Sequence, residues 1–311
     1  MAEWATFVVV SQDGTHEVYE ARFGAVGIDH DLLAGPDVVV PAVRARPRVD
    51  HWRGDWMVEA AALFDLRDRV LLFFASEGPV TRFRHRAVTR RALARAWPGW
   101  ELRWTHDGPA DLLRHLGLDP AVVRERDPRV FPAPLLDPDD EEFLERDPLV
   151  TVVTVGDHRC HLLGAINDHP VAEGPALLDR LAGVHDHGRC TLAAEAGIHL
   201  DPVGERVGWW TMSATPEAGE MDARWPGWTV EFWRDRWEEH ARAAPGRLVP
   251  PRVDPRQALA ELREDAVEHW TRRPGDPWCG WLQAAVSDAV AEKVVADFDT
   301  WCAGDAGGQA L

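Results

Sequence analysis

The sequence predicts an α+β fold that is internally duplicated, with mostly antiparallel sheet units and a C-terminal helical tail. Three observations predict it. The tetrapeptide Trp-Pro-Gly-Trp (WPGW) occurs at 97–100 and again at 225–228, and alternating apolar residues follow each copy. Two segments with the pattern of β-hairpins precede each WPGW. The landmarks of both halves also follow in the same order, which is the expected signature of a repeated unit. Each unit is therefore predicted as hairpin, hairpin, helix, WPGW strand and helix.

The first copy begins with a predicted hairpin. Residues 5–11 and 16–23 are apolar or alternating, and Asp13-Gly14 lies between them. An Asp-Gly pair between two such segments is a strong signal for a tight hairpin turn.

The next part of the first copy is less regular. Segment 24–55 is rich in Gly and Pro, and Val38–Val40 is its candidate for a buried strand. A second hairpin is predicted over 56–64 and 69–75. The apolar run in its second strand is nearly continuous, which indicates burial on both faces of the sheet.

A basic helical pattern follows over 82–96, and the Pro-Gly of WPGW ends it before a strand at 100–105. A short helix is predicted at about 110–116. Segment 119–148 is rich in Pro and carries an acidic run, so we expect an extended connector and then a short acidic helix beginning at Asp137.

The second copy repeats this order with shorter loops. Asp157 matches Asp13 in the first turn, and in the second hairpin Trp210 matches Phe73 and Ser213 matches Ser76. Its predicted hairpins cover 149–155 with 158–166 and 191–200 with 205–213, and its predicted helices cover 175–181 and 234–243.

The remaining chain is predicted to be helical. One helix covers 254–270, and a second covers 278–302 with an apolar stripe of 3.6-residue period, which predicts packing on the body of the protein. The predicted divisions are 1–148 for the first copy with its Pro-rich acidic connector, 149–255 for the second copy and 256–311 for the C-terminal helical extension.

The composition argues against several classes of function. The net charge of −18 disfavours nucleic-acid binding through a broad basic surface. No apolar run is long enough to span a bilayer and no secretory signal is visible, so we expect no membrane association and a cytoplasmic protein. The cysteines show no CxxC spacing and are expected to be reduced. Lys293 is the single lysine, and neither a phosphate-binding GxxxxGK[ST] loop nor a GxSxG motif occurs.

Histidines and aspartates are dense in the second copy and suggest a metal site. Imidazole and carboxylate together suit Zn²⁺ or Fe²⁺. No HExxH motif or complete facial triad supports the site, and histidines in turns explain the density equally well. Cys160 and His161 are adjacent on a strand and point to opposite faces, which argues against a Cys–His pair. The candidate ligands are His158, His161, His185, His187, His199 and Asp201.

Two further features have both a binding and a structural interpretation. The basic stretch 82–95 offers Arg84, Arg90 and Arg91 to an anionic ligand, or it forms a solvated helix face that balances nearby carboxylates. The WPGW segments present aromatic platforms for a ligand, or they are strand-entry turns whose tryptophans fill the end of each sheet. Since both copies keep the motif, the structural interpretation is favoured for WPGW.

The sequence as a whole favours a non-catalytic cytoplasmic binding protein. Its acidic, Trp-rich surface would engage a protein partner of a regulatory or toxin-neutralising kind, because acidic side chains attract basic partners and Trp is a frequent interface anchor. No cofactor is expected under this hypothesis. The alternative is a metal-dependent enzyme, a hydrolase or oxygenase, that uses Zn or Fe bound by the His/Asp cluster of the second copy.

Overall fold

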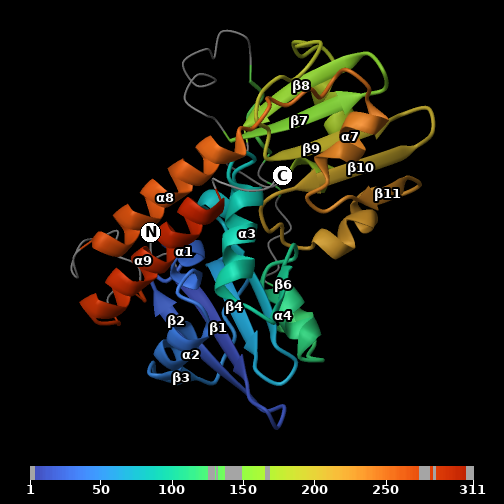
Figure 1. Ribbon diagram of the computed structural model, residues 1–311. Helices are drawn as coiled ribbons and strands as arrows, with labels where there is room; N and C mark the ends of the chain where they lie inside the picture. Colours follow the sequence, from blue (N-terminus) through green and yellow to red (C-terminus); the bar gives the residue numbers. More distant parts are fainter. Residues whose placement is uncertain are drawn as a thin grey trace. The chain divides into compact units, whose positions relative to one another are not determined.

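The computed structural model describes residues 4–124, 130, 132–136, 149–164, 169–272, 281–282 and 285–305. The chain divides into two compact units (Figure 1). Unit 1 comprises Met1–Glu125 and Val253–Leu311, and unit 2 comprises Arg126–Arg252. Each unit combines one sheet with helices, which confirms the α+β class. None of the helices in the described ranges is both long and apolar enough to cross a bilayer.

The sheet of unit 1 contains the two predicted hairpins. β1 (Trp4–Val10) pairs antiparallel with β2 (His16–Arg22), and β4 (Val58–Asp65) pairs antiparallel with β5 (Val70–Ala75). β1 and β4 are parallel neighbours, and β5 is parallel to the WPGW strand β6, so the sheet is mixed. The full order is β3-β2-β1-β4-β5-β6, with β3 at Arg48–Val49 and β6 at Glu101–Trp104.

The sheet of unit 2 has the same topology. Its order is β11-β10-β9-β7-β8. The strands β7 and β8 form one antiparallel hairpin, and β9 and β10 form the other. The two hairpins meet through the parallel pair β7 and β9, and β10 is parallel to the WPGW strand β11. Strand for strand, this order and these directions repeat those of β1, β2, β4, β5 and β6. The predicted duplication is therefore confirmed. The strands are β7 (Val150–Val155), β8 (Arg159–Gly164), β9 (Ala196–Asp201), β10 (Arg206–Thr211) and β11 (Thr229–Phe232).

The first Trp of each WPGW is a buried structural anchor. The indole Nε1–H of Trp97 donates to the carbonyl of Leu32 at 2.7 Å, and that of Trp225 donates to the carbonyl of Val171, also at 2.7 Å. Both rings are almost completely buried. The indole thus satisfies its single donor while filling the core beside the incoming strand, which is the strand-entry role expected from the sequence.

The register of the second hairpins corrects two sequence matches. Val70 pairs with Glu101 at the start of the WPGW strand in unit 1, and Arg206 pairs with Thr229 in unit 2. Phe73 therefore corresponds to Trp209, not to Trp210, and Ser76 corresponds to Met212, not to Ser213. Because side chains alternate along a strand, this shift by one residue moves each matched side chain to the other face of the sheet.

The strand predicted at Val38–Val40 is wrong, because these residues lie in helix α2 (Pro36–Arg44). Pro36 occupies the first helical position after Gly35, where the missing N–H of proline costs nothing. Val39, Val40 and Val43 then form the buried face of the helix, and the clustered valines resemble a strand only when this start signal is overlooked.

Apart from α1, which the sequence did not predict, the other helices of the units lie close to the predicted positions. In unit 2 a 3₁₀ helix, Ala218–Arg224, replaces the basic helix α3 of unit 1. The predicted acidic helix at Asp137 lies outside the described residues. The helices are α1 (Ile28–Leu32), α3 (Arg86–Ala96) and α4 (Pro109–His115) in unit 1, and α6 (Ala176–Leu181) and α7 (Trp237–Ala243) in unit 2.

The C-terminal helices belong to the core of unit 1. α8 (Pro255–Thr271) contacts α3 and lies beside α9 (Asp288–Asp305), as Figure 1 shows. Leu262, Trp270 and Trp301 join the same buried cluster as the residues of the first sheet. α9 begins ten residues later than predicted, because Asp288 starts the first turn, where its carboxylate favours the helix dipole.

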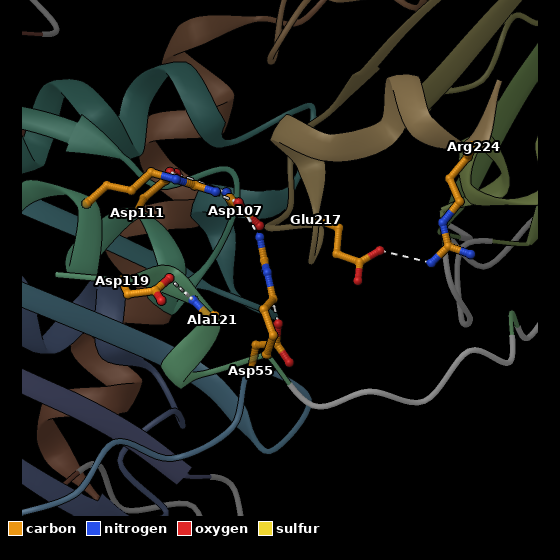
Figure 2. A network of polar contacts seen from close by, with 9 residues as sticks. Asp55, Asp107, Asp111, Asp119, Ala121, Glu217 and Arg224 are labelled. Carbon is orange, nitrogen blue, oxygen red and sulfur yellow. Dashed lines mark hydrogen bonds and ion pairs between the residues drawn. The ribbon is translucent and has the colours of Figure 1, made fainter. Parts of the chain in front are cut away.

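A network of arginines and carboxylates binds Arg124, near the end of the first segment of unit 1 (Met1–Glu125), to the rest of the unit. The guanidinium of Arg124 bonds Asp55 at 3.0 Å and Asp107 at 2.6 Å, and Arg114 bonds Asp107 at 2.6 Å and Asp111 at 2.8 Å. Figure 2 shows the carboxylates of Asp55, Asp107 and Asp111 joined in this way. Because Arg124, Asp55 and Asp107 are nearly buried, these are charge-assisted bonds largely screened from water.

Candidate functional site

A cavity of about 220 Å³ lies in unit 1 between α1, the C-terminal end of α8 and one end of the sheet. The sheet contributes the start of β4 and the segment that follows β5, which a bond of 2.7 Å from the N–H of Ser76 to the carbonyl of Glu59 holds together. Eight of the twelve residues that line it have polar or charged side chains. The lining residues are Ala25, Val26, Gly27, His30, Glu59, Ser76, Glu77, Gly78, Asp265, Glu268, His269 and Arg272.

A hydrogen-bonded Asp–His pair stands at the wall of this cavity. Nε2 of His269, in the last turn of α8, lies 2.8 Å from Oδ1 of Asp31 in α1. Asp31 is completely buried and His269 is 3% exposed. Burial raises the pKa of Asp31, and the neighbouring His269 opposes that rise. A buried carboxylate that holds one imidazole nitrogen is the arrangement that fixes a histidine ring and its tautomer.

A second imidazole, that of His30, stacks on His269 with ring centroids 5.2 Å apart. Burial lowers the pKa of His30 to about 4, so its ring is neutral at pH 7. Its Nε2 is buried and has no hydrogen-bond partner within the described residues. The adjacent Asp29 accepts the N–H of Val80 at 3.1 Å, which holds the turn after β5 against α1.

The cavity is strongly acidic. Glu59, Glu77, Asp265 and Glu268 contribute carboxylates, and Arg272 contributes a guanidinium that bonds Glu268 at 2.7 Å. Burial raises the pKa of Asp265, with the carboxylates of Glu268, Asp29 and Glu261 acting in the same direction and His85 opposing them. A carboxyl group in this position gains from a nearby positive charge.

The histidines proposed as metal ligands lie in unit 2, where the side chains of two of them, His161 and His187, bond to the protein backbone. Nδ1 of His161 lies 2.8 Å from the carbonyl of His185, and Nε2 of His187 lies 2.9 Å from that of Leu136. The ring of His185 stands edge-on to that of His187, with centroids 4.7 Å apart. His158 is exposed in the turn between β7 and β8.

Asp201 has a turn-stabilising role in the same region. Its carboxylate accepts the backbone N–H groups of Val203 and Gly204 at 3.1 and 3.0 Å. Within the described residues, no group of three or more His, Cys, Asp or Glu side chains is arranged to hold a metal ion.

His199, the remaining candidate, ends a chain of hydrogen bonds in unit 2. Nε1 of Trp210 lies 3.1 Å from Nδ1 of His240, whose Nε2 lies 2.8 Å from the hydroxyl of Thr154. The same hydroxyl lies 2.9 Å from Nδ1 of His199. Indole only donates, so Nδ1 of neutral His240 accepts from Trp210 and its Nε2 donates to the hydroxyl of Thr154.

Two thiols near this region are buried. Burial raises the pKa of Cys160 to about 12 and that of Cys190 to about 11. Both are free cysteines. Because the thiolate is the nucleophilic form, neither side chain is suited to nucleophilic attack at neutral pH.

The candidate arginines of the basic stretch do not converge on one site. Arg84 pairs with Glu261 of α8 at 2.6 Å, and the guanidinium of Arg91 lies over the ring of Trp301, 5.8 Å from its centroid. Arg90 is exposed on α3. Arg84, just before α3, and Arg91, on α3, thus each contact one of the C-terminal helices.

The sequence hypothesis missed the residues of the unit 1 cavity. His269 and Asp31 are 238 residues apart, and their pairing depends on the return of α8 to unit 1. A local signal did exist, since His30 lies between two aspartates in Gly-Ile-Asp-His-Asp. It was outweighed by the larger number of histidines in the second copy.

Comparisons with known proteins found no match among protein families, curated proteins or solved structures.

Proposed function

We propose that this chain is a binding protein that recognises a positively charged group in the acidic cavity of unit 1, and that the group belongs to a basic protein partner. The observation that carries the proposal is the wall of the cavity. Four carboxylates, those of Glu59, Glu77, Asp265 and Glu268, face one arginine there, beside two imidazoles. A cation entering this space exchanges its hydration for several charged acceptors.

The size of the cavity supports a side chain as the ligand. Small-molecule sites generally enclose about 300–1,000 Å³. The cavity of unit 1, at about 220 Å³, is smaller and suits one long basic side chain of a partner protein. The rest of such a partner would contact the surface around the opening.

The charge of the whole chain supports a basic partner as well. A net charge of −18 creates a field that attracts cationic surfaces and accelerates encounter. This long-range attraction weakens with salt, and so do contacts with Glu77, Asp265 and Glu268, which are exposed at the opening of the cavity.

The test compares two pairs of charge-neutralising substitutions. Asp265→Asn with Glu77→Gln removes two charges from the cavity, and Asp179→Asn with Glu292→Gln removes two exposed charges elsewhere. The probe is a fluorescein-labelled hexapeptide with a single central lysine, and the readout is fluorescence anisotropy at two salt concentrations.

We expect the cavity pair to weaken peptide binding by about tenfold or more, which corresponds to about 1.4 kcal/mol. The control pair removes the same net charge and should change binding by less than about twofold. Equal losses in both pairs would show that binding depends on overall charge and would overturn the cavity as the site.

A further inference from the structure

We infer that the cavity of unit 1 selects a compact ammonium group, one of whose N–H bonds is accepted by Nδ1 of His269. This inference rests on the proposed function, because it assumes that the cavity binds a cation. It adds the chemical class of that cation and the atom that recognises it.

The Asp31 contact determines which nitrogen of His269 is free to accept. Nε2 lies 2.8 Å from Oδ1 of Asp31, and an ionised carboxylate only accepts hydrogen bonds. With Asp31 ionised, Nε2 carries the proton, and in the neutral ring Nδ1 carries a lone pair. Within the described residues, Nδ1 has no hydrogen-bond partner, although only 3% of the surface of His269 is exposed.

Gly27 lies directly against this edge of the imidazole, and its lack of a side chain leaves the ring its position. Its φ of +65° is in the left-handed region, and a Cβ at this position would lie 2.7 Å from both Nδ1 and Cε1 of His269. A side chain there would crowd the Nδ1–Cε1 edge and force the imidazole to move. Gly27 and His269 both line the cavity to which the carboxylates belong.

The donor geometry favours ammonium over other organic cations. An ammonium is a compact charge with up to three N–H groups, and it can place one on Nδ1 and the others on surrounding carboxylates. A guanidinium is planar and pairs best edge-on with one carboxylate, and a quaternary ammonium has no N–H for Nδ1 to accept. The stacked His30 adds no positive charge at the wall, since burial keeps its ring neutral.

The experiment measures the affinity of the full chain for three cations with the same alkyl group: n-butylammonium, n-butylguanidinium and n-butyltrimethylammonium. Isothermal titration at pH 8 should show n-butylammonium binding at least about tenfold tighter than the others. Single-lysine and single-arginine hexapeptides repeat the comparison with the cation on a peptide, and they separate a free amine from a protein side chain as the source.

The matched variants are Gly27→Ala and Gly117→Ala. Both glycines lie in unit 1 with similar φ values, +65° and +71°, so alanine introduces similar backbone strain at each. A Cβ at Gly117 meets nothing within 4 Å, whereas one at Gly27 contacts His269. Gly27→Ala should reduce ammonium binding by more than tenfold, and Gly117→Ala should leave it unchanged.

The outcomes separate the two proposals. Equal affinity for the three cations and for the two peptides, lost on neutralising Asp265 and Glu77, would overturn ammonium selection and support the acidic cavity as a cation site. Absence of binding by all three cations and both peptides would overturn the proposed function itself. Equal loss in both glycine variants would show that backbone strain, not the crowding of His269, explains the effect.

Discussion

The two units share one sheet topology and differ in the chemistry of one sheet face. In unit 2, Thr154, His199 and Trp210 form a hydrogen-bond chain with His240 of α7. The register places Val8, Leu63 and Phe74 at the corresponding positions of unit 1, where all three are buried apolar residues. The same sheet topology can thus hold buried polar side chains in place of apolar ones, because these polar groups hydrogen-bond to one another.

One small residue accompanies this difference. Gly197 pairs with Trp210, and a Cβ there would lie 2.4 Å from the indole nitrogen and 2.7 Å from Nδ1 of His240. At the corresponding position unit 1 has Ala61, which pairs with Phe74. The larger indole of Trp210 and the imidazole of His240 fit because Gly197, on the neighbouring strand, has no side chain.

The units also differ in how their buried polar groups respond to pH. Unit 1 uses Arg124 to satisfy buried carboxylates, and a guanidinium keeps its charge throughout the accessible pH range. Unit 2 uses neutral histidines. Burial lowers the pKa of His169 to about 4 and that of His240 to about 3.

The largest predicted effect is a loss of stability of unit 2 in acid. Because these histidines have a lower pKa in the fold than the ordinary 6.5, their contribution is complete above pH 6.5 and is lost as pH falls towards 3–4. At pH 4, His169 and His240 should each cost roughly 3 kcal/mol, at about 1.36 kcal/mol per pKa unit. Burial also lowers the pKa of His161 and His199, which adds to the loss.

Hydrogen exchange read by mass spectrometry between pH 7 and 4, corrected for the intrinsic pH dependence, measures this loss. Protection should fall first in peptides from β7 to β10, while peptides from β1 to β5 lose less, with His30 the corresponding lowered group in unit 1. A simultaneous loss of protection in both units would contradict the comparison.

The second prediction concerns the arginine network of unit 1. Arg124→Ala leaves the nearly buried carboxylates of Asp55 and Asp107 without this partner and should reduce the free energy of unfolding by about 3–5 kcal/mol. Arg103→Ala, which breaks an exposed pair with Glu101, should cost less than about 1 kcal/mol. Urea denaturation of both variants provides the measurement. Similar losses in the free energy of unfolding would contradict the prediction that a buried ion pair matters more than an exposed one.

The smallest predicted effect comes from replacing Gly197 by alanine in unit 2 and Ala61 by glycine in unit 1. Gly197→Ala should destabilise unit 2 by about 1–3 kcal/mol, because the added methyl displaces Trp210 or His240. The reciprocal change, Ala61→Gly, should cost unit 1 only about 0.5–1 kcal/mol, mainly through backbone entropy. Thermal melts would detect both. If Gly197→Ala is neutral or stabilising, the indole and the imidazole do not need that space.

Most of the fold could be predicted from local signals. Asp13-Gly14 between two apolar segments predicted the first hairpin, and the second WPGW located the whole repeat. The errors occurred where local patterns are ambiguous. Val38–Val40 suits a strand or a helix until the proline before it is weighed, and the match of Trp210 to Phe73 was wrong because two adjacent aromatic residues, Trp209 and Trp210, fit it equally well.

The candidate site could not be predicted in the same way. Its Asp–His pair joins positions 238 residues apart, across a complete second unit, and no periodic pattern specifies that contact. Gly27 was visible only as one glycine in an irregular segment. What distinguishes it is the distance from its missing Cβ to an imidazole nitrogen, which depends on packing.

The most direct test of ammonium recognition is to observe His269 itself. In ¹⁵N-histidine NMR spectra of the full chain, assigned with a His269→Gln variant, the free protein should show a protonated Nε2 and an unprotonated Nδ1 at this residue. Adding n-butylammonium should shift the Nδ1 resonance in proportion to occupancy, and Gly27→Ala should remove the shift. A Nδ1 resonance that stays unchanged at ligand concentrations that saturate binding would contradict recognition by this atom.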